Sequence, residues 1–206
     1  MVKQNYFRLC LVTDRALAGG RSLAKIVAAA VKGGVTMVQL RDKTAATRLL
    51  IEDARALKAL LAPLRVPLIV NDRIDVALAA GADGAHVGQN DMPVPLVRKL
   101  LGPNAIVGLS ITTSAEACAD DIAFADYLGV GPIFPQMTKP DAAGTLGLNG
   151  LAAIRRITGK PILAIGGVTA ANARDVGSAG ADGVAVVSAI MGAQDPMAAA
   201  AAFKRD

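Results

Sequence analysis

The chain has 206 residues and a formal net charge of +5, and 53% of its residues are hydrophobic, 19% charged and 3% aromatic. This length fits one domain, this composition excludes a disordered chain, and two cysteines are too few for a disulfide scaffold. The sequence has no apolar run long enough for a membrane span and does not begin like a secretory leader, so we expect a cytoplasmic protein without a membrane partner. It has no long basic run and few aromatic residues, which argues against a nucleic-acid partner. The positive charge then suits either an anionic small molecule or a solvated surface.

Short apolar, β-branched runs alternate with Ala/Leu-rich helical stretches along the whole chain. We predict strands at Phe7–Thr13, Thr36–Arg41, Pro67–Val70, Gly84–Val87, Ala105–Leu109, Tyr127–Val130, Pro161–Ile165 and Gly183–Val187. We predict helices at Ser22–Lys32, Ala45–Leu61, Ile74–Ala80, Val94–Leu101, Ser114–Asp120, Gly150–Thr158, Ala170–Ala179 and Asp195–Lys204. The central strands are almost entirely apolar, which is typical of parallel strands that are covered on both faces.

A short internal repeat supports a recurring unit of helix, tight turn and strand. The sequence Ala-Gly-Ala-Asp-Gly occurs at Ala80–Gly84 and again at Ala179–Gly183, with a glycine placed to end a helix in the left-handed conformation. Roughly eight such units fit the small end of the (β/α)8 barrel, and the glycine fingerprint of a doubly wound sheet is missing after the first strand. We therefore predict an α/β fold, a single-domain TIM barrel over residues 1–206.

Polar residues gather where the predicted strands end, which is the active end of a TIM barrel. Gln39, Arg41 and Lys43 follow the second strand and share one face if the chain stays extended. Asp72 and Asp91 follow the third and fourth strands, and such a pair suits Mg²⁺, which keeps positions for water and phosphate oxygens. The alternatives are a solvated loop for the cations, a helix cap for Asp72 and a turn for Asp91.

Few other side chains suit chemistry. His86 is the only histidine and ends the fourth strand, where a packed, hydrogen-bonded imidazole is the commoner role and a general base the alternative. Cys10 and Cys118 have no histidine partner nearby, so we interpret both as small core residues, and zinc is disfavoured. Ser110 ends the fifth strand, where it either donates a hydrogen bond to a ligand or caps the next helix.

The later strands end in loops that suit anions. The sixth strand leads into the long irregular segment Gly129–Pro140, which contains Lys139. Gly166–Gly167 and Val187–Ser188 follow the last two strands, where this architecture commonly binds phosphate through backbone N–H groups, with a tight turn as the alternative for the diglycine. Lys139, the two cations after the second strand and Mg²⁺ would suit a diphosphate, and the backbone site a monophosphate. No strong general base or activated nucleophile is visible, which favours a reaction driven by departure of a leaving group.

Taken in order, these segments resemble thiamine phosphate synthase over nearly the whole chain. The resemblance rests on Gln39–Lys43, Val70–Asp72, His86–Asp91, Gly108–Ser110, Gly131–Pro135, Thr138–Lys139, Gly166–Gly167 and Val187–Ser188. It implies a (β/α)8 barrel that acts as a transferase in thiamine biosynthesis, joining hydroxymethylpyrimidine diphosphate to a thiazole phosphate. It also implies a dissociative mechanism, in which pyrophosphate leaves first and the thiazole nitrogen captures a pyrimidine-stabilised carbocation.

The resemblance further implies roles for individual residues. The pyrimidine diphosphate would be held by Gln39, Arg41, Lys43, Asn71, Ser110 and Lys139, and the thiazole phosphate by Thr138, Gly167, Val187 and Ser188. The same substrate-binding segments include Leu40, Asp42, Gln136 and Met137. The catalytic residues would be Arg41, Lys43, Ser110 and Lys139, and the ligands of Mg²⁺ would be Asp72 and Asp91.

Two alternatives stay open at this point. A related thiazole tautomerase looks similar but relies on a histidine after the fifth strand, where this chain has Ile111–Thr112, and it does not need the two aspartates or the cation pair. The other alternative is a non-catalytic paralogue that binds a thiamine precursor. The family usually has Thr or Ser where this chain has Gln136, which predicts weaker binding of the thiazole phosphate. The sequence also leaves the oligomeric state open, a homo-oligomer included.

Overall fold

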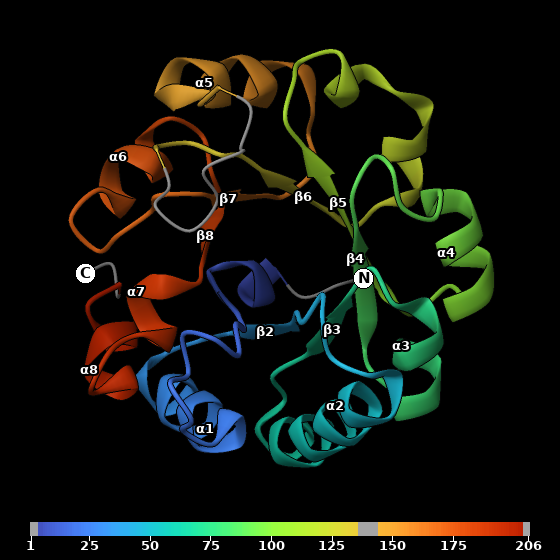
Figure 1. Ribbon diagram of the computed structural model, residues 1–206. Coiled ribbons are helices and arrows are strands. Elements are labelled where there is room, and N and C mark those ends of the chain that lie inside the picture. The colour runs from blue at the N-terminus through green and yellow to red at the C-terminus, as the bar shows by residue number, and fades with distance from the viewer. Residues whose placement is uncertain (1–3, 136–143, 204–206) are drawn as a thin grey trace.

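The computed structural model describes residues 4–135 and 144–203, and its eight parallel strands close into one barrel in chain order (Figure 1). The strands are β1 (Leu9–Val12), β2 (Met37–Leu40), β3 (Leu68–Asn71), β4 (Gly84–Val87), β5 (Ile106–Ile111), β6 (Tyr127–Val130), β7 (Ile162–Ile165) and β8 (Gly183–Val186). β1 pairs with both β2 and β8, which closes the barrel. All eight predicted strands and the predicted TIM barrel are therefore confirmed.

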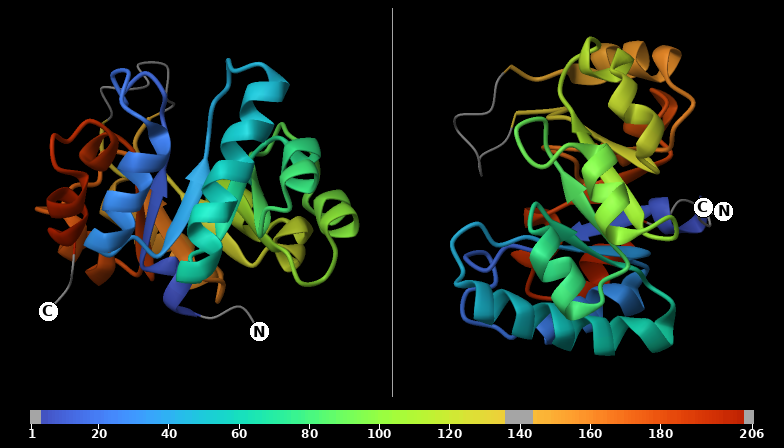
Figure 2. Two further views of the ribbon diagram at one scale, coloured as in Figure 1. Left: turned by 90° about the horizontal axis from the view of Figure 1, so that it is seen from below. Right: turned by 90° about the vertical axis from the view of Figure 1, so that its right-hand side faces the viewer.

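Helices form a ring around the barrel (Figures 1 and 2). The α-helices are α1 (Leu23–Gly33), α2 (Thr47–Leu61), α3 (Ile74–Ala80), α4 (Val94–Leu101), α5 (Gly147–Ile157), α6 (Ala173–Ser178), α7 (Ser188–Met191) and α8 (Pro196–Ala201). The short 3-10 helices are η1 (Gln4–Phe7), η2 (Ala62–Leu64), η3 (Glu116–Cys118) and η4 (Asp120–Phe124). Within the described part of the chain, no helix has both the length and the apolar character that a membrane crossing needs.

The predicted helix at Ser114–Asp120 is wrong, because η3 and η4 occupy this region with the extended residue Ala119 between them. The residues that these two turns bury are Ala117 and Ile122. An α-helix brings residues three or four positions apart onto one face, and these two are five apart. No single helical face could therefore bury both of them against the barrel.

Alternate residues of each strand face the inside of the barrel, as the period of two requires. The interior cluster contains Phe7, Cys10, Val12, Met37, Ile69, Ile106, Tyr127, Leu163 and Ala185. The residues between them in the strands pack against the helices. Burial raises the pKa of Cys10 to about 12, which confirms its place in the core. Cys118 is exposed, so its interpretation as a core residue is wrong.

Three aspartates, which we call the base aspartates, lie at the end of the barrel where the strands start: Asp83, Asp126 and Asp182. Each accepts a hydrogen bond of 2.8 Å from a backbone N–H at the start of the preceding strand, on Leu68, Val107 and Ile162 respectively. Each also pairs with a cation from a surrounding helix, namely Lys58, Arg98 and Arg155. Two of the three belong to the sequence repeat, whose glycines adopt the expected left-handed conformation with φ of 63° and 108°. The repeat thus ties neighbouring strands to each other and to the helix layer.

Candidate active site

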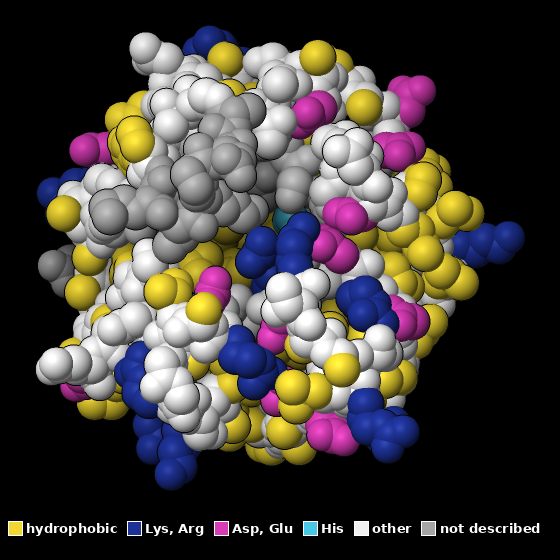
Figure 3. All heavy atoms as spheres, in the orientation of Figure 1, with side chains coloured by type: hydrophobic (Ala, Val, Ile, Leu, Met, Phe, Trp, Pro, Cys, Tyr) yellow, Lys and Arg dark blue, Asp and Glu magenta, His cyan; other side chains and the backbone are white. Residues whose placement is uncertain are grey.

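The mouth of the barrel, where the strands end, gathers charged side chains around the single histidine. Figure 3 shows Lys and Arg side chains and neighbouring carboxylates beside the histidine, near the centre of this face. The alternation of side chains along the strands directs Gln39, Asn71, His86 and Ser110 toward this end of the interior. The mouth of the barrel is therefore the candidate anion site.

The end of β2 carries the predicted cations. Gln39 is buried with 6% of its surface exposed, and its carbonyl accepts a hydrogen bond from the Thr13 N–H at 2.9 Å. The Arg41 N–H donates to the Thr13 hydroxyl oxygen at 3.0 Å, so β1 fixes the segment that leads to Lys43. Lys43 Nζ lies 3.4 Å from Asp72 Oδ2. Our sequence reasoning missed Thr13, although it follows a predicted strand end in the same way as the other candidates.

Asp72 and Asp91 lie close together, as predicted. Burial and the adjacent Asp91 carboxylate raise the pKa of Asp72, and only the neighbouring Lys43 ammonium opposes this effect. Asp72 adopts the left-handed conformation, with φ of 60°, and its N–H donates to the His86 carbonyl at 2.9 Å. The cap of α3 falls instead on Arg73, whose side chain makes no capping hydrogen bond, so the alternative role of Asp72 as a helix cap is wrong.

Asp91 also fulfils the alternative suggested for it. Its Oδ2 accepts a hydrogen bond from the Gly88 N–H at 2.7 Å, which closes a turn after β4. The same carboxylate also faces Asp72, so the turn and a ligand role are compatible. Asp91 therefore points a negative charge at Asp72 from a turn that holds it in place.

This pair of carboxylates fits a magnesium ion better than a zinc ion. Two carboxylates whose repulsion raises a pKa gain from a divalent cation placed between them. Mg²⁺ commonly binds one or two protein carboxylates and keeps its water and phosphate ligands, whereas zinc needs three or four protein ligands. Across residues 4–135 and 144–203, no group of three or more His, Cys, Asp or Glu side chains gathers as such a site would require.

His86 lies inside the barrel with both ring nitrogens engaged. Its Nδ1 lies 3.0 Å from the Tyr127 hydroxyl and its Nε2 lies 2.9 Å from the Ser110 hydroxyl. Burial lowers the pKa of His86 to about 4, and the nearby Asp91 opposes this effect only in part. The packed, hydrogen-bonded imidazole is thus confirmed, and a ring without a free nitrogen is a poor general base.

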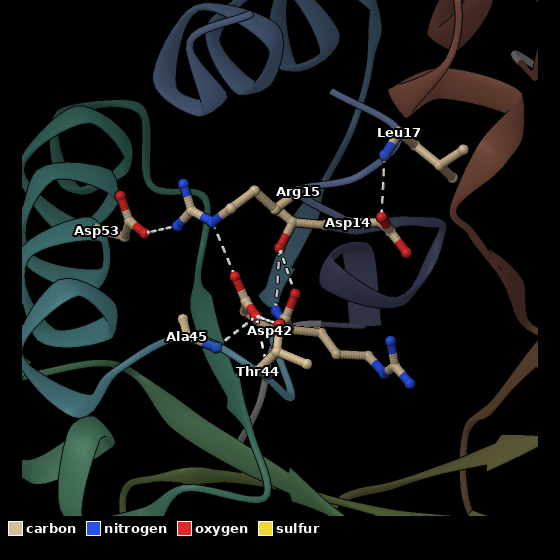
Figure 4. Close-up of polar contacts among 9 residues, drawn as sticks. Asp14, Arg15, Leu17, Asp42, Thr44, Ala45 and Asp53 are labelled. Atoms are coloured by element: carbon tan, nitrogen blue, oxygen red, sulfur yellow. Dashed lines mark hydrogen bonds and ion pairs between the residues drawn. The ribbon is translucent and has the colours of Figure 1, made fainter. Parts of the chain in front are cut away.

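Asp42 holds its own loop together (Figure 4). Its Oδ1 accepts hydrogen bonds from the N–H groups of Thr44 at 3.0 Å and Ala45 at 2.9 Å, and its Oδ2 lies 2.8 Å from Arg15 Nε. Arg15 also pairs with Asp53 on α2. Burial disfavours the charged carboxylate, but the Arg15 guanidinium and the loop N–H groups outweigh it and lower the pKa of Asp42. Asp42 therefore lies within the predicted binding segment while its carboxylate serves the loop.

The remaining predicted residues lie at the ends of other strands or outside the described residues. Asn71 ends β3 in register with His86, whereas the side chain of Leu40 packs in the layer between barrel and helices. At Gly167, with φ of 66°, a Cβ atom would lie 2.7 Å from Phe134 Cβ, so this backbone approaches the loop after β6 closely. Val187 and the exposed Ser188 begin α7 at the end of β8. Outside the described residues lie Gln136, Met137, Thr138 and Lys139.

A parallel barrel whose mouth carries a cation beside paired carboxylates is suited to an enzyme that acts on phosphorylated small molecules. The family model described as thiamine monophosphate synthase matches residues 9–190, and the chain belongs to this family. The predicted family and the enzyme class that it implies are therefore confirmed.

Individual relatives agree. The chain is 54% identical to the thiamine-phosphate synthase of Albidiferax ferrireducens, over 97% of this chain and 91% of the relative. It is 56% identical to the thiamine-phosphate synthase of Chloroflexus aurantiacus, over 94% of this chain and 89% of the relative. The solved structure of thiamine phosphate pyrophosphorylase from Pyrococcus furiosus superposes with a TM-score of 0.88 at 38% identity, covering 97% of this chain and 95% of that one.

Proposed function

We propose that this protein makes thiamine phosphate by joining hydroxymethylpyrimidine diphosphate to a thiazole phosphate, with release of pyrophosphate. The observation that carries this proposal is the convergence of Lys43, Asp72 and Asp91 at the mouth of a barrel of this family. One cation and two carboxylates around a metal are suited to a diphosphate leaving group.

We assign Asp72 and Asp91 as the residues that would hold Mg²⁺. When bound, the ion would neutralise negative charge on the diphosphate oxygens. The Lys43 ammonium faces this pair, and Arg41 follows the end of β2 that Thr13 fixes, which supports our assignment of both cations to the diphosphate. By the family resemblance, Lys139 would add a third cation. Gln39, Asn71 and Ser110 would hold the rest of this substrate.

The reaction needs leaving-group stabilisation rather than a base. The C–O bond between the pyrimidine methylene and the diphosphate breaks, and the electron pair leaves with pyrophosphate. The lone pair of the thiazole nitrogen then forms the new C–N bond to the carbocation, and no proton has to be removed. Arg41 and Lys43 stabilise the charge that grows on the leaving group. A buried, doubly hydrogen-bonded His86 is consistent with a step that requires no general base.

The thiazole phosphate would bind on the opposite side of the mouth. We assign it to the backbone around Gly167 and to Val187 and Ser188, which follow β7 and β8. Backbone N–H groups in such loops commonly bind phosphate in this architecture. Thr138, and Gln136 and Met137 beside it, would complete this subsite by the family resemblance. The cytoplasmic location and a homo-oligomeric state stay predictions from the sequence.

The deciding experiment supplies purified protein with both substrates and Mg²⁺ and measures pyrophosphate release. We expect release only when both substrates are present, together with stoichiometric thiamine phosphate. Isomerisation of a thiazole substrate without the pyrimidine diphosphate would instead indicate a tautomerase. Binding of the substrates without turnover would indicate the non-catalytic paralogue.

A further inference from the structure

Three polar side chains from three different strands form a hydrogen-bonded chain inside the barrel. The phenol oxygen of Tyr127 on β6 lies 3.0 Å from Nδ1 of His86 on β4. Nε2 of His86 lies 2.9 Å from the hydroxyl of Ser110 on β5, at the mouth. Of these three side chains, Ser110 is the one that has been given a role at the diphosphate. The other two connect it to the core.

Two glycines on neighbouring strands leave room for the imidazole ring of His86. A Cβ atom at Gly108 would lie 2.3 Å from His86 Nδ1, and one at Gly129 would lie 2.8 Å from His86 Cε1. The His86 and Tyr127 rings pack against each other with centroids 5.4 Å apart. Glycine at both positions thus lets the ring lie in one fixed orientation between its two partners.

The group to which the Tyr127 hydroxyl donates its hydrogen decides which atom is the donor in each hydrogen bond of this chain. Tyr127 is buried, and leaving the hydrogen of a buried hydroxyl without an acceptor is costly, so this hydrogen needs an acceptor inside the barrel. The rest of the interior cluster around the phenol is apolar. Among the described residues, the acceptor within hydrogen-bond distance of this hydroxyl is His86 Nδ1. Tyr127 therefore donates to Nδ1, and the ring carries its own proton on Nε2.

A ring with its proton on Nε2 donates to the Ser110 oxygen. The hydrogen of the Ser110 hydroxyl then cannot point at the ring and is directed elsewhere. We propose that Tyr127 and His86 are positioning residues that fix the Ser110 hydroxyl as a hydrogen-bond donor toward the mouth. This inference rests on the proposed function for its consequence, because a donor stabilises charge that grows on a departing diphosphate, whereas an inward-turned hydroxyl would not.

The substitution Tyr127→Phe interrupts the hydrogen-bonded chain and leaves Ser110, at its end, in place. Without the phenol hydroxyl, Nδ1 loses its donor and the ring is free to carry its proton there. Nε2 would then accept the hydrogen of Ser110 and turn the hydroxyl inward. The Phe side chain keeps the ring that packs against Phe7 at a centroid distance of 5.1 Å. The change therefore removes one hydrogen-bond donor while most of the packing stays.

The first test reads the imidazole directly and needs no activity. His86 is the only histidine in the chain, so the ring nitrogens of the uniformly ¹⁵N-labelled protein give one unambiguous set of long-range ¹H–¹⁵N correlations. At neutral pH we expect the pattern of a neutral ring protonated on Nε2, and loss of that single pattern in Tyr127→Phe. A wild-type ring protonated on Nδ1, or on both nitrogens, would overturn the proposal.

The second test is a double-mutant cycle on pyrophosphate release with Tyr127→Phe, Ser110→Ala and both changes together. We expect each single change to lower kcat by roughly tenfold, the worth of one hydrogen bond to a charged group. The double variant should be no slower than Ser110→Ala alone, because Tyr127 acts through Ser110. Equal slowing by Tyr127→Phe with and without Ser110 would overturn the proposal.

Tyr6→Phe is the matched control, since Tyr6 is the other tyrosine of the chain and lies in η1, at the opposite end of the barrel. We expect it to leave kcat and the ring correlations unchanged. If the wild-type protein released no pyrophosphate at all, the proposed function would fail while the ring correlations could still show the donor direction. A Tyr127→Phe protein that did not fold would leave the wild-type correlations to decide the same question.

Discussion

The two ends of the barrel treat carboxylates in opposite ways. At the end where the strands start, each base aspartate accepts a backbone hydrogen bond and pairs with a cation from a helix. At the mouth, Asp72 and Asp91 face one another, and the cation beside them is Lys43, whose side chain is 60% exposed. The carboxylates at the first end have their charge balanced by cations of the protein itself. The two carboxylates at the mouth still repel each other and would be stabilised by a bound cation.

This contrast indicates where the fold gains stability and where it retains function. Each base aspartate ties together two neighbouring strands and a helix, so its removal should cost stability. The raised pKa of Asp72 means that its charged form is disfavoured in the folded protein. Neutralising one member of that pair should cost activity rather than stability. Substitutions at the two ends should therefore separate loss of stability from loss of activity.

Asp91→Asn should produce the largest effect. The amide oxygen can still accept the hydrogen bond from the Gly88 N–H, so the turn stays, but one negative charge is lost. We expect kcat/KM for pyrophosphate release to fall at least about a hundredfold, which corresponds to about 3 kcal/mol of transition-state stabilisation. A magnesium titration of the rate should show a higher requirement for the ion.

The stability of the same variant should stay within about 1 kcal/mol of the parent, or rise slightly as repulsion is relieved. Urea unfolding followed by circular dichroism measures this. Asp120→Asn, an exposed carboxylate on η4, is the matched control and should change neither quantity. Near-parent turnover in Asp91→Asn would show that this carboxylate does not serve the mouth.

His86 makes stability depend on pH. Its pKa falls from 6.5 to about 4 on folding because burial disfavours the imidazolium. As the pH drops below 6.5, the unfolded chain takes up a proton that the folded protein refuses. The free energy of unfolding should therefore fall by about 1.4 kcal/mol per pH unit, to a total of about 3 kcal/mol near pH 4. Burial of the neutral His86 ring therefore makes the folded protein less stable in acid.

The measurement is a set of urea unfolding curves between pH 7 and pH 4 for the wild type and for His86→Gln. Asp72 has a raised pKa and acts with the opposite sign in acid, but it is present in both proteins and cancels in the difference. We expect the difference between the two profiles to change by about 3 kcal/mol across this window. Parallel profiles would mean that His86 accepts a proton in the folded protein.

Asp126→Ala tests the other end of the barrel. It removes the acceptor of the Val107 N–H and one partner of Arg98, although the Arg98 guanidinium still donates to the Ala105 carbonyl at 2.6 Å. We expect the free energy of unfolding to fall by about 2 kcal/mol, with kcat/KM unchanged. Asp126→Asn keeps an acceptor for the strand and should lose about half as much. Loss of turnover in a folded Asp126→Ala protein would contradict the division between the two ends.

The sequence predicted the strands and the residues at their ends because both leave a local signal. Apolar runs mark strands that are buried on two faces, and polar residues directly after them, such as Asp72 and Asp91, stand out. The roles that it missed depend on partners far along the chain. Asp126 meets Arg98 28 residues away, and the loop of Asp42 depends on Arg15, 27 residues away. No local pattern shows which of two neighbouring polar side chains turns to the mouth and which turns to its own loop.

Asp42→Asn should give the smallest effect and separates support of the mouth from contact with substrate. The amide oxygen can still accept from the Thr44 and Ala45 N–H groups, but an amide cannot pair with the Arg15 guanidinium. The loop that carries Lys43 toward Asp72 should loosen, and we expect kcat/KM for the pyrimidine diphosphate to fall about fivefold, or about 1 kcal/mol. Asp53→Asn removes only the second partner of Arg15 and should change kcat/KM less than twofold. Steady-state kinetics with the pyrimidine diphosphate varied at saturating thiazole phosphate measures both. A hundredfold rise in KM for Asp42→Asn would mean that this carboxylate contacts the substrate, and equal effects of the two variants would mean that the Arg15–Asp42 pair supports the loop no more than the Arg15–Asp53 pair does.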